Sequence, residues 1–562
     1  MKKSWDLVRE VVSINKHKLS IPEYFHHSGR IIEDSLEVVE EFNDFFVDVG
    51  PKLAREIPQN SRNFASYLRT PVRENFTFRR ITQEMIIEAC GRLKPKTSFG
   101  HDCISTKMLK LMLPHILVPL CHLLNLSIQT GYIPLQFKIA KVIPIFKSGD
   151  AHQFNNYRPI SILTSFSKLF EKIIATQVMM FINKLNILYM HQYGFRRNHN
   201  TSQPMLQFLN KLYHGLNKNN PDIIISVFLD LTKAFDTVDH DIMLKKLDFY
   251  GFRGVANLWF TNYLKGRRQY VYIKGMESTT RPIVCGVPQG SVLGPLLFLL
   301  YINDLPFCSE FFTLLFADDT TFQLSGANSQ ELFTQANEEL KKAATWFQAN
   351  KLTLNTSKTK FMVFRRSNCD IDLTTLSLEV GSEEIERIGE GCRETAFKFV
   401  GHYIDDKLKW NHHIKHLRCK LSRSNYIIAK SKNFLPQKIR TTLYHSLFRS
   451  HLEYGIVNWG GALPSNLKCL VNLQKKCIRN VAGKRARDHT DPIFSKLEVL
   501  KLNDLYKVNL LTFMHKYYYN KQPVGFSNFF NLCPAREILP NRQTNYEIEK
   551  SKNNAIENLP IV

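Results

Sequence analysis

The stretch that most constrains the fold of this chain is FTLLFADDTTFQL at residues 312–324, where two apolar runs flank an acidic pair. Apolar and β-favouring residues on both sides of a short polar joint predict a β-hairpin with Ala317 and Asp318 at its tip. Neighbouring carboxylates repel each other, and a bound divalent cation relieves that repulsion. Asp318 and Asp319 therefore predict a metal site, although Asp-Asp is also ordinary turn chemistry.

A third acid ends an upstream apolar run, IIISVFL at residues 223–229, which is followed by Asp230. Such a β-branched run is typical of a strand buried on both faces. If this strand lies beside the hairpin, its end faces the acidic tip. Three carboxylates on two elements can hold two magnesium ions roughly 4 Å apart, one at an attacking hydroxyl and one at a leaving pyrophosphate. We therefore expect two Mg²⁺ ions, with Mn²⁺ as an alternative.

Composition narrows the class of protein. The 562 residues carry 75 Lys and Arg against 50 Asp and Glu, a formal charge of +25, which favours a polyanionic partner such as nucleic acid. A basic soluble protein without such a partner is the alternative. Eleven cysteines without a CxxC pair indicate neither a disulfide framework nor a zinc knuckle, and they favour a reducing compartment.

No membrane or secretory segment is expected. The N-terminus lacks the apolar core of a signal peptide. The apolar stretch at residues 111–128 contains Pro114 and Pro119, so we expect a core helix rather than a membrane span.

Three motifs resemble those of reverse transcriptases, and in particular those of non-LTR (LINE-type, jockey-like) retrotransposons. They are FLDLTKAFDTVDH at 228–240, GVPQGSVLGPLLF at 286–298 and FADD at 316–319, in the order that the family shows. The resemblance covers about residues 30–525. It implies an RNA-directed DNA polymerase with an α+β right-hand fold, in which fingers, a palm with an antiparallel sheet and a helical thumb surround the site.

The resemblance also implies a division of the chain and a set of partners. We expect a helical linker segment at 1–80, fingers at 81–222, a palm at 223–404 (reverse transcriptase domain about 128–404), a helical thumb and C-terminal region at 405–530 and a loose tail at 531–562. The implied partners are an RNA template, a DNA primer and dNTPs. The chain starts within the family's linker, so we expect the endonuclease to be absent and the location to be intracellular and nuclear. A separate endonuclease is one candidate for supplying the nick, but the sequence does not indicate what supplies it.

Two predicted strands, at residues 137–150 and 156–163, form the fingers hairpin that this family closes on a nucleotide. Lys141, Lys147 and Arg158 project from it. Point-charge lysine and bidentate arginine suit a triphosphate, so we assign Lys141 and Arg158 to that role. Solvated charges on an edge hairpin are the alternative.

Phe235 matches the position at which reverse transcriptases place a ring beneath the incoming sugar. A ring there leaves no room for a 2′-hydroxyl and selects deoxynucleotides by steric exclusion; an ordinary buried phenylalanine is the alternative. Asp236 and Asp239 are expected to cap or solvate the next helix.

The resemblance implies further contacts with the substrates. Gln289 and Gly290 touch the template base and the nascent pair, and Lys358 protonates or steadies the departing pyrophosphate.

Other residues are expected to hold nucleic acid. Arg196, with Arg197, precedes a predicted helix and could contact the template or simply be solvated. Gly401 and His402 lie in FVGH, which resembles the primer-grip hairpin. Residues 401–450 hold 11 Lys and Arg against two Asp, which predicts a basic thumb surface that tracks a duplex.

Two other functions remain open from the sequence. One is an RNA-templated RNA polymerase, against which Phe235 argues. The other is a catalytically silent nucleic-acid-binding remnant of a mobile element. The sequence does not indicate the oligomeric state or which RNA is copied.

Overall fold

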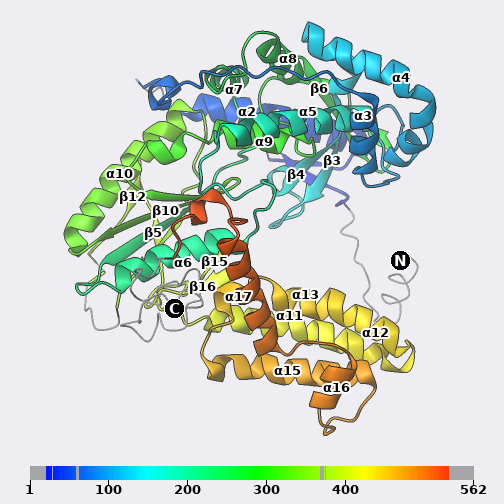
Figure 1. Cartoon of the computed structure of the whole chain (residues 1–562). Coiled ribbons are helices and arrows are strands. Elements are labelled where there is room, and N and C mark those ends of the chain that lie inside the picture. Colours follow the sequence, from blue (N-terminus) through cyan, green and yellow to red (C-terminus); the bar gives the residue numbers. More distant parts are fainter. Residues whose placement is uncertain (1–20, 28, 59–61, 367–371, 374, 531–562) are drawn as a thin grey trace.

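Two five-stranded sheets and a C-terminal group of helices organise the chain (Figure 1). The computed structural model describes residues 21–27, 29–58, 62–366, 372–373 and 375–530, so the expected tail at 531–562 lies outside the described residues. The first sheet, here called the central sheet, has the order β14-β11-β5-β10-β9. Its strands are β5 (Ile223–Leu229), β9 (Phe312–Phe316), β10 (Asp319–Gly326), β11 (Lys360–Phe364) and β14 (Glu386–Ile388).

The predicted buried strand is the middle of the central sheet. β5 pairs antiparallel with β10 and β11, while β11 and the edge strand β14 are parallel. Because strand side chains alternate between faces, β5 supplies two cores. Ile223, Ile225, Val227 and Leu229 enter one core, and Ile224 and Phe228 enter the other. The prediction of a strand buried on both faces is confirmed.

Helices cover both faces of the central sheet. On one face lies α10 (Ser329–Ala349), and on the other lies α6 (Ser202–Leu216). The short hairpin of β15 (Phe397–Phe399) and β16 (His402–Ile404) joins α6, with the rings of Phe228 and Phe397 stacked at 4.2 Å.

The second sheet has the order β4-β3-β6-β7, with β8 also paired to β6. Its strands are β3 (Ile139–Phe146), β4 (Tyr157–Ile162), β6 (Arg267–Ile273), β7 (Met276–Glu277) and β8 (Arg281–Ile283). The predicted hairpin is present as β3 and β4, whereas β6 joins β3 in parallel from far along the chain. Strands β6, β7 and β8 lie within residues 223–404, the range expected for the palm. They nevertheless belong to the same sheet as β3 and β4, which were expected in the fingers.

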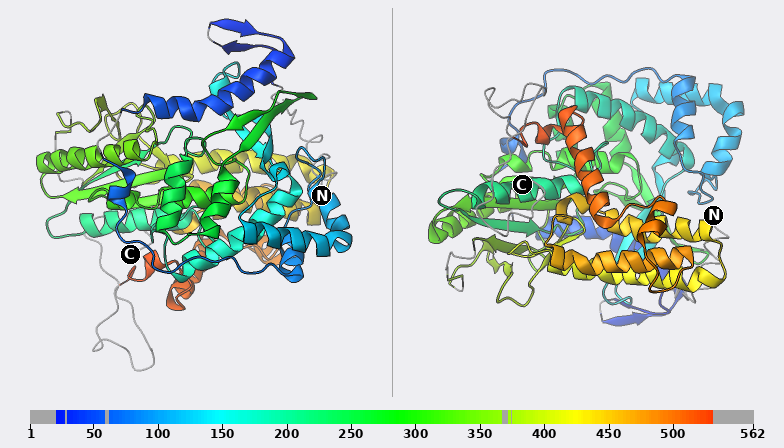
Figure 2. Two further views of the ribbon diagram at one scale, coloured as in Figure 1. Left: turned by 90° about the horizontal axis from the view of Figure 1, so that it is seen from above. Right: turned by 60° about the horizontal axis from the view of Figure 1, so that its bottom comes forward.

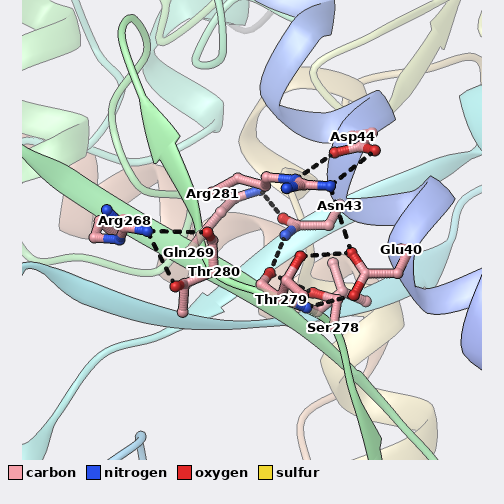
Figure 3. A network of polar contacts seen from close by, with 10 residues as sticks. Glu40, Asn43, Asp44, Arg268, Gln269, Ser278, Thr279, Thr280 and Arg281 are labelled. Carbon is pink, nitrogen blue, oxygen red and sulfur yellow. Dashed lines mark hydrogen bonds and ion pairs between the residues drawn. The ribbon is translucent and has the colours of Figure 1, made fainter.

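An N-terminal helix, α2 (Ser35–Glu56), is fixed to this second sheet by polar contacts (Figure 3). Asn43 is fully buried; its Nδ2 donates to the Thr279 carbonyl at 2.8 Å, and its Oδ1 accepts from Gln269 Nε2 at 3.1 Å. Glu40 accepts from the backbone N–H and the hydroxyl of Thr279 at 2.6 and 2.8 Å. The expected linker region thus includes a helix that packs as part of the second sheet, preceded by the small pair β1 (Phe25–His27) and β2 (Arg30–Ile32).

Further helices surround the second sheet and the junction of the two sheets. They are α3 (Gln83–Gly91), α4 (Thr106–Thr130), α5 (Ser165–Lys184), α7 (His240–Phe249), α8 (Val255–Leu264) and α9 (Leu293–Tyr301). Within the described ranges, α4 alone is long and apolar enough to cross a membrane by length and composition. Leu113 and Leu120 lie in the core, but Leu111 and Val118 are 70% and 65% exposed. The expected core helix therefore packs on one face only.

The C-terminal helices form a bundle below the central sheet. Its main members are α11 (Asn411–Lys430), α12 (Gln437–Leu443), α13 (Ser450–Glu453), α14 (Ile456–Trp459), α15 (Pro464–Ala482), α16 (Asp491–Lys496) and α17 (Leu502–Tyr518). Figures 1 and 2 show α17, in orange-brown, running from this bundle back toward α6. The segment after α17 is fastened there, since Gln207 Nε2 donates to the Gly525 carbonyl at 2.6 Å.

Candidate active site

The acidic hairpin turn is held in an unusual backbone conformation. Ala317 and Asp318 join β9 to β10 as predicted, and Ala317 has φ +59°, a left-handed conformation that costs a non-glycine residue about 1–3 kcal/mol. The side chain of Gln192 stabilises this turn, because its Oε1 accepts from the N–H of Ala317 at 3.1 Å and of Gly194 at 2.8 Å. Segment 192–194 therefore clamps the acidic hairpin.

Gly194 lies so close to the turn that no side chain fits. A Cβ at this position would lie 2.2 Å from the backbone nitrogen of Ala317. The QYGF sequence at 192–195 places a glycine two residues after Gln192, but the sequence does not reveal that both residues contact Ala317.

Asp230 lies at the end of β5, where Leu229 pairs with Thr320 of β10. A loop before β11 holds it: the Asp230 carbonyl accepts from Asn355 N–H at 2.8 Å, and the Asp230 N–H donates to the Thr359 hydroxyl at 3.3 Å. The same loop brings Lys358 Nζ to 3.8 Å from Asp230 Oδ2.

A cavity of about 210 Å³ collects side chains from both sheets. The predicted residues that line it are Asp230, Asp318, Phe235, Gln289, Arg158 and Lys358. Lining residues that the sequence did not single out for the site are Lys233, Asn155, Asn156 and Asn355, together with Lys147, which was noted only as a projecting charge. The cavity thus combines two carboxylates with several cations and amides.

The carboxylates of the cavity fit a divalent cation. Burial, together with the negative charge of Asp230, raises the pKa of the Asp318 carboxyl, while the charges of Lys147 and Arg158 oppose that rise. The two carboxylates repel each other, and a hard divalent cation bound between oxygen ligands relieves that repulsion. Across the described ranges, however, no three His, Cys, Asp or Glu side chains are grouped closely enough to enclose a metal. Asp230 and Asp318 would be an open pair, with substrate phosphates and water completing the coordination.

Asp319 stands apart from this pair. It does not line the cavity, and the residue is exposed. Its carboxyl is nonetheless crowded: burial, followed by the charges of Asp318 and Asp230, raises its pKa to about 6. Two of the three predicted metal ligands therefore line the cavity, and Asp319 lies close enough for their charges to act on it.

Phe235 and Gln289 are set by two loops that run side by side. Val287 N–H donates to the Phe235 carbonyl at 2.8 Å. The Phe235 ring stacks on Phe298 at 4.7 Å and meets the edge of Phe195 at 6.2 Å. The ring lines the cavity while its other contacts fix its position.

Asp236 has a different role from the one expected. Asp239 caps α7 by accepting from the N–H groups of Asp241 and Ile242, as predicted. Asp236 instead accepts from Gln289 Nε2 at 2.9 and 2.8 Å, so the expectation that it caps or solvates the helix is wrong. Burial raises the pKa of the Asp236 carboxyl to about 6, against the opposing effects of Gln289 and Lys233.

The loop that carries Gln289 is attached to the second sheet. Ser161 N–H of β4 donates to the Gln289 carbonyl at 2.8 Å. Gly290 has φ +133°, and a Cβ there would lie 2.4 Å from the Ser161 carbonyl oxygen. Gly290 is therefore required for close backbone approach, and it does not itself line the cavity.

A buried carboxylate, that of Glu171, stabilises the end of the loop that carries Gln289. Glu171 of α5 is 2% exposed and accepts from the N–H groups of Val292 and Leu293 at 2.6 and 3.2 Å. These are unpaired donors at the start of α9, so Glu171 acts as its cap.

Lys141 is not brought to the cavity. Its ammonium lies 3.5 Å from the centre of the Tyr272 ring and 3.7 Å from Glu277, and the side chain is 9% exposed. Arg158, which lines the cavity, pairs across the hairpin with Ile145. Ile145 is four residues beyond Lys141, so Lys141 lies roughly 13 Å along the strand from the level of Arg158. Lys147, past the hairpin end, lines the cavity instead.

His402 does not line the cavity either. It is fully buried, its ring stacks on Tyr454 at 5.3 Å, and burial lowers its pKa to about 4. Its side chain is therefore closed off from solvent, so the predicted primer contact of this turn would come from the backbone at Gly401 and His402. Gly401, with φ +83°, lies in the turn that Tyr454 holds by donating to the Val400 carbonyl at 3.1 Å.

Arg196 is anchored rather than free. Its Nη1 donates to the carbonyls of Tyr189 and Gln192 at 3.2 and 3.1 Å. It lines a larger cavity outside the one just described.

Comparison with known proteins agrees with this geometry. Residues 145–404 match the family "Reverse transcriptase (RNA-dependent DNA polymerase)". This segment of the chain is therefore similar to reverse transcriptase domains, and the chain is similar to RNA-directed DNA polymerases of mobile elements.

Three relatives illustrate this similarity. The chain is 26% identical to the RNA-directed DNA polymerase from mobile element jockey of Drosophila melanogaster, over 79% of this chain and 48% of the relative. It is 29% identical to the probable RNA-directed DNA polymerase from transposon BS (74% and 46%) and 26% identical to that from transposon X-element (71% and 43%), both of the same fly. The chain spans about half the length of these curated relatives.

Proposed function

We propose that this chain is an RNA-directed DNA polymerase of a jockey-like non-LTR element, which copies RNA into DNA from dNTPs. The observation that carries this proposal is that Asp230 and Asp318, from separate parts of the chain, line one cavity with Arg158, Phe235 and Gln289. An RNA template, a DNA primer and dNTPs are the partners in this proposal. A separate endonuclease and a nuclear location rest on the resemblance alone.

The architecture supports a right-hand arrangement. We assign the palm to the central sheet, the fingers to the second sheet and its helices, and the thumb to the C-terminal bundle. In this assignment β6, β7 and β8 are part of the fingers, although they lie within the chain range 223–404.

The reaction joins the primer 3′-oxygen to the α-phosphorus of the dNTP and breaks the bond from that phosphorus to pyrophosphate. Asp230 and Asp318 would hold divalent metal, Mg²⁺ in the first instance with Mn²⁺ possible, and Asp319 is a third candidate ligand. The bound metal supplies charge neutralisation and lowers the pKa of the attacking hydroxyl.

The other lining residues act on the nucleotide itself. Arg158 and Lys147 bind the triphosphate. Lys358, 3.8 Å from Asp230, offers a proton or a positive charge to the leaving pyrophosphate. Phe235 closes the space that a 2′-hydroxyl would need.

Primer extension tests this proposal. A DNA primer annealed to poly(rA) is incubated with the protein, dTTP and Mg²⁺, in parallel with UTP in place of dTTP and with EDTA in place of metal. We expect extension with dTTP only, and none with EDTA. Extension with UTP at an equal rate would instead indicate an RNA polymerase, and RNA binding without any extension would indicate a silent remnant.

A further inference from the structure

A cavity larger than that of the candidate active site lies outside it, at the junction of the palm and the C-terminal bundle. It has a volume of about 780 Å³. One wall is the segment 196–203 with the N-terminal part of α6, and the other is α17 with the segment 520–524. The walls belong to parts of the chain that are far apart in sequence.

The lining of this cavity is basic and rich in amides. Among its 20 lining residues are Arg196, Arg197, Lys516 and Lys521, together with six asparagines and two glutamines, and none is Asp or Glu. Glu453 lies outside the lining, and its carboxylate accepts from the lining residue Asn509 at 3.4 Å. The negative charge of Glu453 is already paired with Arg449 at 3.2 Å. A cavity of this kind favours an anion and offers no ligand set for a cation.

The first wall is continuous with the catalytic hairpin. Gln192 and Gly194 contact the backbone of Ala317, and Arg196 follows two residues later, with its guanidinium fixed on the carbonyls of Tyr189 and Gln192. An anionic strand in this cavity would therefore lie close to the residues that clamp the catalytic turn.

The second wall lies outside the segment that matches the reverse transcriptase family, which ends at residue 404. On α17 the lining residues are Asn509, Thr512, Phe513 and Lys516, which stand at positions i, i+3, i+4 and i+7. This spacing defines one face of a helix. Lys507 lies two positions before Asn509, so it points to another side of α17.

We propose that this cavity binds a single strand of nucleic acid by its sugar-phosphate backbone, with α17 as the second wall of the site. The proposal rests on the proposed function and deepens it, because it assigns template or product binding to a helix beyond the catalytic domain. Lysine and arginine neutralise the phosphates, and amides can both donate to phosphate oxygens and pair with base edges. The half-buried ring of Phe513 offers an apolar surface against which a base or sugar can rest.

Equilibrium binding of labelled 20-nucleotide RNA and DNA strands tests this site in the full chain. The variant Lys516→Gln/Lys521→Gln removes two charges from the lining, and Lys507→Gln removes one charge from the same helix outside it. With about 0.7 counterions released per neutralised phosphate of a single strand, we expect the plot of log affinity against log salt to become shallower by roughly 1.4 in the double variant. Affinity at low salt should fall about tenfold or more. Lys507→Gln should bind with the same affinity as the natural protein. Comparing the affinities for RNA and for DNA shows which of the two nucleic acids the site prefers.

The outcomes separate this inference from the proposed function. If the natural protein extends primers but the double variant binds strands with unchanged affinity and salt dependence, the site is wrong and the polymerase proposal stands. If no extension occurs but the double variant loses binding, the site stands and the polymerase proposal fails. Displacement of RNA by polyglutamate at equal charge concentration would also contradict the inference, since it would indicate a general polyanion or acidic-protein surface.

Discussion

The side-chain amide of Gln289 donates to both carboxylate oxygens of Asp236, at 2.9 and 2.8 Å. This contact occupies the side-chain nitrogen of Gln289, a residue that lines the cavity of the candidate active site. Asp236 is therefore a positioning residue for Gln289, although the sequence suggested that it caps or solvates the next helix.

Replacing Asp236 tests that relationship. In Asp236→Ala the amide of Gln289 loses its partner and can rotate, so we expect KM for dNTP to rise about tenfold with a smaller change in kcat. Steady-state primer extension over a range of dNTP concentrations measures both. Equal KM values in the variant and the natural protein would show that Asp236 does not position Gln289.

The same carboxylate makes stability depend on pH. The folded-state pKa of Asp236, about 6, lies above the ordinary value of 3.8. The contribution of the protonated carboxyl to the free energy of unfolding is therefore fully present below about pH 4 and is lost as the pH rises through 6. Asp236→Asn removes this titration, and we expect it to gain about 1–2 kcal/mol of unfolding free energy relative to the natural protein between pH 4 and pH 8. Urea unfolding at the two pH values measures the gain. A difference that does not change with pH would refute the assignment.

Phe235 should control the choice of sugar. In Phe235→Ala the space beneath the nucleotide opens, and we expect the ratio of rNTP to dNTP incorporation to rise by roughly 10–100-fold. Competition between the two substrates in primer extension measures the ratio. Phe235→Tyr keeps the ring and serves as the control, so a rise in that variant would argue against exclusion by bulk.

Glu171 should stabilise the loop beneath Gln289. Glu171→Ala leaves the N–H groups of Val292 and Leu293 unpaired at the start of α9, and we expect a loss of about 2–4 kcal/mol in unfolding free energy. Denaturant unfolding measures the loss. Glu171→Gln keeps an acceptor oxygen and should lose less; an equal loss in both variants would assign the effect to charge alone.

Gly194 should be essential to the catalytic turn. Gly194→Ala puts a methyl group 2.2 Å from the Ala317 nitrogen, so the hairpin must shift, and we expect kcat to fall by roughly 100-fold. Gly91→Ala, where a Cβ meets nothing within 4 Å, is the matched control and should retain activity. Natural activity in Gly194→Ala would show that the clamp does not matter.

Local sequence patterns predicted the elements that carry the site. The hairpin with Ala317 and Asp318 at its tip, the buried strand ending at Asp230 and the β3-β4 hairpin all follow from β-favouring runs and turn residues. What these patterns could not predict were contacts between distant segments. Gln289 meeting Asp236 depends on how two loops pack, and β6 joining β3 depends on a parallel pairing far along the chain.

The misplaced side chains have the same cause. Lys141 looked like a nucleotide contact because it is a lysine on the correct hairpin, but strand position, which a charge pattern does not encode, turns it toward Tyr272. His402 is in the expected turn, yet its packing against Tyr454 depends on the junction of α13 and α14, about fifty residues later.

The most direct test of the account is extension of a primed RNA in Mg²⁺ by the natural protein and by Asp318→Ala, with Asp248→Ala as a control for an exposed acid outside the cavity. We expect Asp318→Ala to lose synthesis by at least about 10³-fold while retaining RNA affinity, and Asp248→Ala to be unchanged. Synthesis by Asp318→Ala at the natural rate would contradict the account.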